Sequence, residues 1–253
     1  MTIKAIQPVA LITGGTRGIG AATARLLAQQ GYALCLNYRQ DEASAKTMQQ
    51  ELSAIAPKVI IAQADVAIES QVVALFERID NELGALTALV NNAGKLAQQM
   101  PLVDMSASRV SDVLMTNVMS CFLCSREAVK RMSTSRGGQG GSIVNVGSAA
   151  SYTGAPNEYV DYAASKGAID SMTKGLSLEV AGDGIRVNGV RPGCIYTQMH
   201  ADGGEPERVD RLASLLPMGR GGQPEEVAEA IAWLLSNKAS FATGTFIDLA
   251  GGR

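Results

Sequence analysis

The chain has 253 residues, a mass of 26.4 kDa, 46% hydrophobic and 18% charged residues, and a formal net charge of −2. This composition excludes a wholly disordered chain, and the slightly acidic balance disfavours non-specific binding to nucleic acid or anionic membranes. No apolar run approaches the ~18 residues of a membrane span, and the N-terminus does not resemble a cleaved signal peptide. The four cysteines form no disulfide framework, so we expect a cytoplasmic protein.

Short β-like segments alternate with helical segments along the whole chain. Several β-like segments are nearly continuous apolar runs, which suit strands covered on both faces of a parallel sheet. Segments 21–30 and 69–83 end beside a glycine, and segment 224–236 begins with proline and two glutamates, as helix ends commonly do. The alternation predicts a doubly wound α/β fold, with a seven-stranded parallel sheet, helices on both faces and a ligand site at the carboxyl edge of the strands. The predicted strands are residues 9–13, 32–38, 59–64, 86–91, 142–146, 185–190 and 245–249.

No linker divides the chain, so we expect a single domain over residues 1–253. Residues 198–217 form a long, polar and irregular stretch that contains two adjacent glycines. An irregular stretch of this length in a compact domain is usually functional. We therefore predict that it forms a lid over the ligand site.

The sequence TGGTRGIG, residues 13–20, follows the first predicted strand and opens the first predicted helix. Its glycines allow a tight turn that brings the backbone close to a pyrophosphate, and the free N–H groups of a helix N-terminus favour an anion. The spacing is Gly14-x-x-x-Gly18-x-Gly20 rather than the strict GxGxxG. The strand–turn–helix context nevertheless favours a dinucleotide cofactor.

The second predicted strand ends in Asn37-Tyr38-Arg39, where a site for NAD(H) places a carboxylate on the ribose. No acid stands there. Arg39 and Arg17 instead supply two guanidinium groups, which suit a 2′-phosphate, so the sequence favours NADP(H) over NAD(H). In the alternative interpretation, which the neighbouring Asp41 and Glu42 leave open, Arg39 is a solvated surface residue.

Polar residues also end the third and fourth predicted strands. Asp65 is placed either to accept a hydrogen bond from the adenine amino group or to serve as a turn or helix-cap residue. The segment Asn91-Asn92-Ala93-Gly94 ends the fourth strand at the same edge of the sheet. The candidate cofactor residues of this half are Gly14, Thr16, Arg17, Gly18, Ile19, Asn37, Tyr38, Arg39, Asp65, Val66, Asn91, Ala93 and Gly94.

Tyr162 and Lys166 are four residues apart in a predicted helix, so the phenol and the ammonium share one helix face. A nearby positive charge favours the phenolate, so we expect the pKa of Tyr162 to fall from ~10 toward neutrality, which suits proton exchange with a carbonyl or alcohol oxygen. Ser148 closes the fifth strand, where its hydroxyl could orient that oxygen. Asn117 lies in an apolar helical stretch, where either a kink that holds a water or a core hydrogen bond accounts for its amide. The chemistry needs no metal.

Together these motifs resemble the short-chain dehydrogenase/reductase family over essentially the whole chain, and in particular its bacterial 3-oxoacyl-acyl-carrier-protein reductases and glucose 1-dehydrogenases. Residues 13–20 match the family's TGxxxGIG, residues 91–94 its NNAG and residues 186–193 its RVNxVxPG segment. The resemblance implies a Rossmann fold. It also implies a catalytic tetrad of Asn117, Ser148, Tyr162 and Lys166.

The same resemblance implies a role for each of these residues. Tyr162 would be the acid/base, Lys166 its tuner and a ribose ligand, and Ser148 the ligand of the substrate oxygen. Asn117 would hold a proton-relay water. Four further residues are implied to contact the cofactor, with the backbone of the third at the carboxamide and the fourth near the nicotinamide or pyrophosphate: Pro192, Gly193, Ile195 and Thr197.

One spacing departs from the family pattern. Ser148 precedes Tyr162 by fourteen residues, slightly more than the family leads us to expect. We expect the extra residue in the loop 154–159. Ser151 is a weaker candidate for the role of Ser148, because it falls beyond the end of the strand.

The implied reaction is hydride transfer between a nicotinamide and a carbonyl carbon, and we expect it to run toward reduction of a small-molecule carbonyl substrate by NADPH. Alternatives are a catalytically idle NADP(H)-binding protein, an NAD-dependent sugar or alcohol dehydrogenase, and a sugar-nucleotide epimerase. His200, the single histidine, is interpreted as a bystander rather than a substrate ligand.

The helix after Tyr162 is rich in small residues, and together with the last strand it predicts a homotetramer, or else a dimer. Neither nucleic acid nor a membrane is an expected partner.

Overall fold

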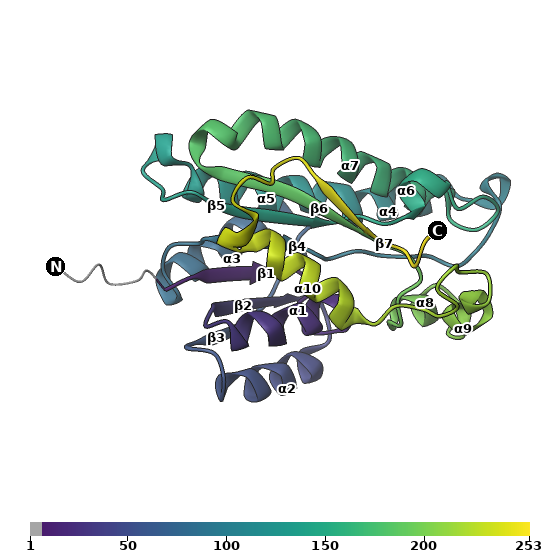
Figure 1. The fold of residues 1–253 in the computed structure, drawn as a ribbon, viewed down its shortest axis with the longest axis horizontal. Coiled ribbons are helices and arrows are strands. Elements are labelled where there is room, and N and C mark those ends of the chain that lie inside the picture. The colour runs from purple at the N-terminus through teal and green to yellow at the C-terminus, as the bar shows by residue number, and fades with distance from the viewer. Residues whose placement is uncertain (1–6) are drawn as a thin grey trace.

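A computed structural model describes residues 7–253, which form one sheet of seven parallel strands in the order β3-β2-β1-β4-β5-β6-β7 (Figure 1). The chain starts at the middle of the sheet and winds outward in both directions, which is the doubly wound arrangement. The predicted fold class is confirmed, and every predicted strand lies within two residues of its observed bounds. The strands are β1 (Val9–Ile12), β2 (Ala33–Tyr38), β3 (Val59–Gln63), β4 (Ala88–Asn91), β5 (Gly141–Val146), β6 (Ile185–Pro192) and β7 (Phe246–Leu249).

Both faces of the sheet are buried. In β1, Val9 and Leu11 pack into one hydrophobic core, while Ala10 and Ile12 pack into the other. All four side chains are 1% exposed or less. This double burial explains why the strands appear in the sequence as continuous apolar runs rather than as alternating ones.

Helices cover the two faces in separate layers (Figure 1). The helices α1 (Gly18–Gln29), α2 (Glu42–Ser53) and α10 (Pro224–Leu235) cover one face, and α3 (Glu69–Glu82), α5 (Ser120–Met132) and α7 (Val160–Val180) cover the other. The remaining helical segments are α4 (Ala107–Leu114), α6 (Ala150–Thr153), α8 (Met199–Asp202), α9 (Arg208–Ala213), the π-helical turn η2 (Met115–Met119) and the 3₁₀ turns η1 (Leu102–Asp104), η3 (Thr134–Arg136), η4 (Ala181–Asp183) and η5 (Asn237–Ala239).

In two segments the structure adds helical turns that the sequence did not predict. The stretch 198–217 is not irregular throughout, because it contains α8 and α9, which are too short for a helical period to show in the sequence. The helix that carries Asn117 is interrupted by the π-helical turn η2. A π-helical turn inside an α-helix is rare and frequently marks a functional site.

The carboxyl ends of all seven strands point to the same edge of the sheet, and α8 and α9 lie beyond that edge (Figure 1). The loops that leave β1, β4, β5 and β6 therefore converge beside these two short helices. Within residues 7–253, no helix is both long and apolar enough to cross a bilayer.

Candidate active site

The loop between β1 and α1 forms a tight glycine turn. Gly14 and Gly18 adopt left-handed backbone conformations, with φ of 59° and 52°. The N-cap residue Arg17 makes no side-chain hydrogen bond to the helix, and the first turn contains no acid. The N–H groups at the start of α1 are therefore available to an anion, as the pyrophosphate of a dinucleotide requires.

Asn92, which the sequence did not single out for its side chain, holds this turn in place. Its Nδ2 donates to the carbonyl oxygens of Thr13 and Gly14, at 2.9 and 3.0 Å. The hydroxyl of Thr13 in turn accepts from the backbone N–H groups of Asn92 and Ala93, at 3.0 and 2.9 Å. The segment that follows β4, which contains the predicted Ala93 and Gly94, is thus hydrogen-bonded to the glycine turn and the residue before it.

The two predicted phosphate-binding arginines lie on the surface and make only exposed ion pairs. Arg17 contacts Asp202 of α8 at 2.9 Å, and Arg39 lies 4.0 Å from Asp65. Exposed pairs of this kind contribute little to stability, so both guanidinium groups can exchange their partners for a phosphate. Asp65 also accepts a hydrogen bond from the Ala67 N–H at 3.0 Å, which is the turn role considered for it above.

Two predicted cofactor residues use their side chains inside the protein. The amide of Asn37 donates to the carbonyls of Ala62 and Ala64, and its oxygen accepts from the Gly14 N–H. The amide of Asn91 donates to Ser125 and Asn145. Both residues are buried, so their side chains stabilise the protein interior next to the site. Thr16, Tyr38 and Val66 are buried as well.

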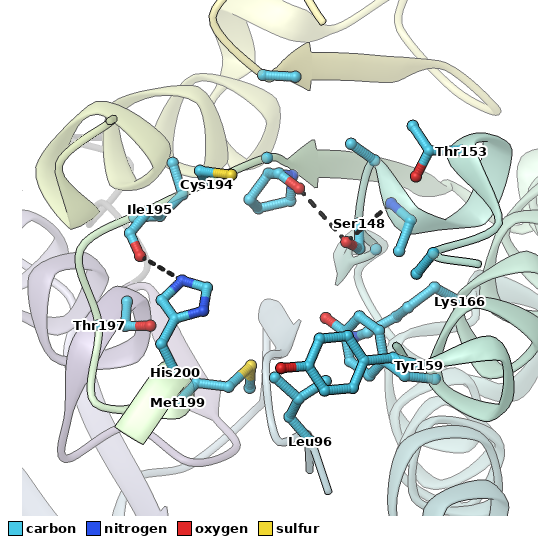
Figure 2. A pocket seen from close by; sticks show the side chains of 18 of the residues that line it. Leu96, Ser148, Thr153, Tyr159, Lys166, Cys194, Ile195, Thr197, Met199 and His200 are labelled. Carbon is cyan, nitrogen blue, oxygen red and sulfur yellow. Dashed lines mark hydrogen bonds between the residues drawn. The ribbon is translucent and has the colours of Figure 1, made fainter. Parts of the chain in front are cut away.

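A cavity of about 390 Å³ opens between the strand ends and α8 (Figure 2). It brings together Ser148 after β5 and both Tyr162 and Lys166 of α7, which the sequence placed in one catalytic group. Five further predicted cofactor residues line the same cavity: Ile19, Pro192, Gly193, Ile195 and Thr197. Thr197 also lies directly against the glycine turn, because a Cβ added to Gly18 would be 3.3 Å from its methyl group.

The protonation of the central pair is governed by burial. Burial raises the pKa of Tyr162 to about 12, and the neighbouring Ser148 hydroxyl opposes this increase. Burial also lowers the pKa of Lys166 to about 8, and its Nζ donates to the carbonyl of Val146 at 2.7 Å. The expected fall of the Tyr162 pKa is therefore wrong for this arrangement, because desolvation of the phenol outweighs any effect of the ammonium. A protonated phenol suits a proton donor.

Ser148, and not Ser151, faces the cavity. The hydroxyl of Ser148 accepts from the Ala150 N–H at 3.1 Å, which fixes its direction. The segment after α6, where the extra residue is expected, has an unusual backbone. Ala155 and Asn157 there have φ of 42° and 61°, in the left-handed region that residues other than glycine rarely adopt.

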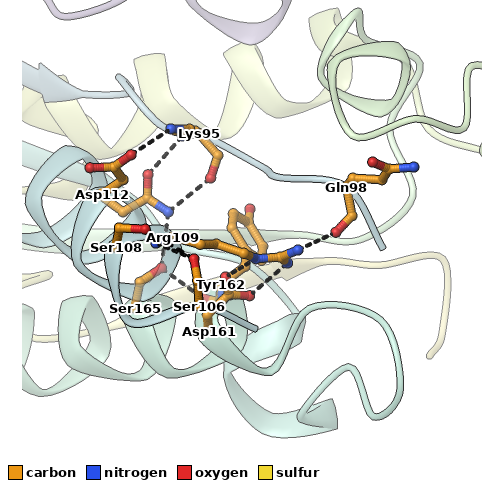
Figure 3. A network of polar contacts seen from close by, with 10 residues as sticks. Lys95, Gln98, Ser106, Ser108, Arg109, Asp112, Asp161, Tyr162 and Ser165 are labelled. Carbon is orange, nitrogen blue, oxygen red and sulfur yellow. Dashed lines mark hydrogen bonds and ion pairs between the residues drawn. The ribbon is translucent and has the colours of Figure 1, made fainter. Parts of the chain in front are cut away.

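Asn117 lies in η2 and links three segments of the chain (Figure 3). Its Oδ1 accepts from the Lys95 N–H at 2.7 Å, and its Nδ2 donates to the Lys95 carbonyl at 3.1 Å and to Ser165 Oγ at 3.0 Å. The core hydrogen bond considered for its amide is thus present, within a π-helical turn. Asn117 connects the segment after β4 to α7, one residue away from Lys166.

A buried ion pair fixes the first turn of α7 (Figure 3). Arg109 of α4 contacts Asp161 at 2.9 Å, and the two side chains are 11% and 1% exposed. The other carboxylate oxygen of Asp161 accepts from the N–H of Tyr162 at 2.9 Å. The backbone that carries the phenol is therefore held by α4.

Ion pairs join the segment that contains α8 and α9 to the body of the protein. Arg208 contacts Glu158 at 2.5 Å and Glu205 at 3.1 Å, and its guanidinium lies 5.2 Å from the centre of the Tyr159 ring. The ring of His200 contacts the Ile195 carbonyl at 3.0 Å. The predicted lid thus touches both the cavity wall and the loop after β6.

The Cys121-x-x-Cys124 pair lies within α5 and is buried. Burial raises the pKa of both thiols, so neither is a ready metal ligand or nucleophile. Among the described residues, no group of three or more His, Cys, Asp or Glu side chains could hold a metal ion.

A family model described as "Enoyl-(Acyl carrier protein) reductase" matches residues 14–253. The chain is 60% identical, over 97% of its length and 99% of the relative's, to a protein from Escherichia coli (strain K12) named "Uncharacterized oxidoreductase YgfF". The chain belongs to the short-chain dehydrogenase/reductase family. Its members are oxidoreductases that bind a nicotinamide cofactor, and the free N–H groups of α1 and the glycine turn fit such a cofactor.

Other relatives within this family carry more specific names. The chain is 34% identical to the 3-oxoacyl-[acyl-carrier-protein] reductase FabG of Staphylococcus aureus, over 96% of each chain. It is 35% identical to the glucose and ribitol dehydrogenase homolog of Oryza sativa subsp. japonica, over 98% of this chain and 86% of the relative. A mutant short-chain dehydrogenase/reductase from Serratia marcescens matches the structure with a TM-score of 0.88, at 31% identity and 97% coverage of both chains.

Proposed function

We propose that the protein is an NADP(H)-dependent carbonyl reductase. The observation that carries this proposal is the cavity in which Ser148, Tyr162 and Lys166 meet beside Thr197 and the glycine turn. A nicotinamide bound there supplies the hydride. An idle dinucleotide-binding protein would have no need for a phenol, an ammonium and a hydroxyl around one cavity.

In the proposed reaction, Tyr162 donates its proton to the substrate oxygen as the carbonyl carbon accepts the hydride, so that one alcohol forms from one carbonyl. The raised pKa of Tyr162 keeps the phenol protonated before each turnover. Ser148 donates a hydrogen bond to the same oxygen and orients it. Lys166 holds the ribose, Asn117 holds a water that returns the proton to Tyr162, and the segment 198–217 covers the bound substrate as a lid.

The proposal is tested by initial rates of NADPH and NADH oxidation with a panel of acetoacetyl thioesters, diketones, aldehydes, quinones and keto-sugars. Turnover of at least one carbonyl with NADPH supports it. NADPH binding without turnover of any panel member, in either direction of the reaction, would favour the idle binder.

Preference for NADP(H) is proposed to depend on Arg39, with Arg17 as the second cation. The Arg39→Ala variant is expected to weaken NADPH binding about tenfold or more and NADH binding by less than about twofold, because only NADPH carries the 2′-phosphate. Fluorescence titration of both cofactors measures this. Arg25→Ala removes another surface arginine, one paired with Glu51 at 2.6 Å, and serves as the control. Equal losses for the two cofactors would contradict the assignment.

We also propose a homotetramer, with a dimer as the smaller alternative. On the face covered by α5 and α7, Phe122 is 50% and Leu178 is 70% exposed, and Gly167 and Gly175 of α7 have open space where a Cβ would be. Such a surface allows close helix packing between subunits. Light scattering is expected to give four times the 26.4 kDa chain mass, and a smaller species for the Phe122→Glu/Leu178→Glu variant. A wild-type monomer at micromolar concentration would refute this.

A further inference from the structure

Two side chains of the cavity carry polar atoms without a partner. Within residues 7–253, Oη of Tyr159 and Nδ1 of His200 are screened from water and make no hydrogen bond. Both residues line the cavity that contains Ser148 and Tyr162. Unpaired buried polar atoms are rare because they are unfavourable, and a pair of them in a ligand cavity indicates groups that a ligand completes.

The tautomer of His200 follows from its one contact. Its Nε2 lies 3.0 Å from the carbonyl oxygen of Ile195. A carbonyl only accepts, so Nε2 carries the ring proton and donates it. Burial lowers the pKa of His200, which keeps the ring neutral. Nδ1 is therefore an acceptor, and it requires a donor from the ligand.

Tyr159 supplies a hydrogen-bond donor, where His200 supplies an acceptor. Its side chain is 97% buried, at 3% exposure, and burial raises its pKa, so the phenol keeps its proton. Gln99 lies near the hydroxyl and opposes this increase in pKa, but its Nε2 donates to Glu205, and the Tyr159 Oη has no hydrogen-bond partner within residues 7–253. The hydroxyl of Tyr159 therefore offers a donor that requires an acceptor from the ligand.

The donor and the acceptor face each other across the cavity. Figure 2 shows His200 and Met199 on the side of α8 and Tyr159 on the side of α7, and all three residues line the cavity. Methionine is flexible and adapts readily, so Met199 can move aside for a ligand group. A hydroxyl group both donates and accepts, and it matches this pair of atoms better than an aliphatic chain does.

We propose that Tyr159 and His200 select a carbonyl substrate that carries an additional hydroxyl group, as sugars and other hydroxyketones do. A substrate hydroxyl donates to Nδ1 of His200, and a substrate oxygen accepts from Oη of Tyr159. The inference rests on the carbonyl reductase function proposed above. Arg208, whose guanidinium lies 5.2 Å from the centre of the Tyr159 ring, is paired with both Glu158 and Glu205, so it offers no free positive charge to an anionic group beside Tyr159.

The test compares ketones that differ only in a terminal hydroxyl or methyl group: hydroxyacetone against butanone, and the two next longer homologous pairs. For each pair, kcat/KM with saturating NADPH is measured for the wild type and for His200→Leu, His200→Asn and Tyr159→Phe. Asparagine restores an acceptor oxygen near the position of Nδ1. Tyr196→Phe is the matched control, because it removes a tyrosine hydroxyl that contacts Asp210 and lies outside the cavity.

We expect the wild type to prefer the hydroxyketone of at least one pair by about tenfold or more. His200→Leu and Tyr159→Phe should each reduce that preference about fivefold or more, His200→Asn should recover part of it, and Tyr196→Phe should leave it unchanged. A general structural defect would lower both members of a pair and leave their ratio intact. A wild-type ratio near one in all three pairs, or a ratio that survives both substitutions, would overturn the inference.

Binding separates this inference from the proposed function. The same pairs are titrated by saturation-transfer NMR onto the wild type and His200→Leu, with and without NADPH. If no ketone is reduced but the hydroxyketone binds more tightly and loses that advantage in His200→Leu, the selection stands and the reductase proposal fails. Equal binding of both members of every pair overturns the selection.

Discussion

Replacement of Tyr162 by phenylalanine is expected to lower kcat for carbonyl reduction by at least about 100-fold, which is the lower range for loss of a general acid. The phenol is the proposed proton donor of the cavity, and burial raises its pKa to about 12, which keeps it protonated at the start of each turnover. Phenylalanine keeps the ring in place and removes only the hydroxyl. Initial rates of NADPH oxidation measure the loss with the best carbonyl substrate of the panel.

The binding of NADPH distinguishes this loss from a collapsed site. Tyr162→Phe should bind NADPH with an unchanged Kd, because the ring remains and the glycine turn is left intact. Tyr152→Phe removes an exposed phenol that contacts the Arg253 carbonyl at 3.2 Å, and it should retain most of the activity. Wild-type turnover in Tyr162→Phe would require a different proton donor.

Gly20→Ala is expected to raise the Kd for NADPH about tenfold or more and to lower the melting temperature. A Cβ on Gly20 would lie 2.3 Å from the carbonyl oxygen of Gly14 and 2.7 Å from Nδ2 of Asn92. The added methyl group must therefore push the glycine turn away from α1 and break the contacts that Asn92 makes with it. Loss of about 3 kcal/mol would lower the melting temperature by roughly 6–12 °C in a protein of this size.

Gly182→Ala is the matched control for this substitution. No atom lies within 4 Å of the position that its Cβ would occupy, so neither NADPH binding nor the melting temperature should change noticeably. Calorimetry and fluorescence titration measure the two quantities. If Gly20→Ala bound NADPH as the wild type does, the glycine turn would not be the pyrophosphate site.

The sheet could be predicted from the sequence because its strands are short apolar runs that end at polar residues. The glycine turn and the Tyr162–Lys166 pair could be predicted because their spacing along one turn or one helix sets their geometry. Other features depend on contacts between distant segments. Asn37 and Asn91 stand at strand ends, where ligand residues are expected, yet their amides are used by neighbouring backbone and side chains.

The proposed roles of Tyr159 and His200 also could not be predicted from the sequence. Tyr159 has no lysine four residues later, and His200 belongs to no motif in the sequence. Their significance depends on which of their atoms lack a partner in the folded protein, and no sequence pattern records this. The direction of the Tyr162 pKa likewise depends on burial, which the four-residue spacing does not specify.

The left-handed residues Ala155 and Asn157 have a consequence for how this scaffold can diversify. They lie in the connection between β5 and α7, and the two ends of this connection bring Ser148 and Tyr162 to the same cavity. Tyr159 directly follows this loop. We therefore expect insertions or deletions at this point to reshape the cavity wall around Tyr159. Ser148 and Tyr162 would stay in place. Under the proposed roles, changes in this short connection would alter which substrate is chosen and leave the reacting groups unchanged, which makes it a natural point for redesign of the enzyme.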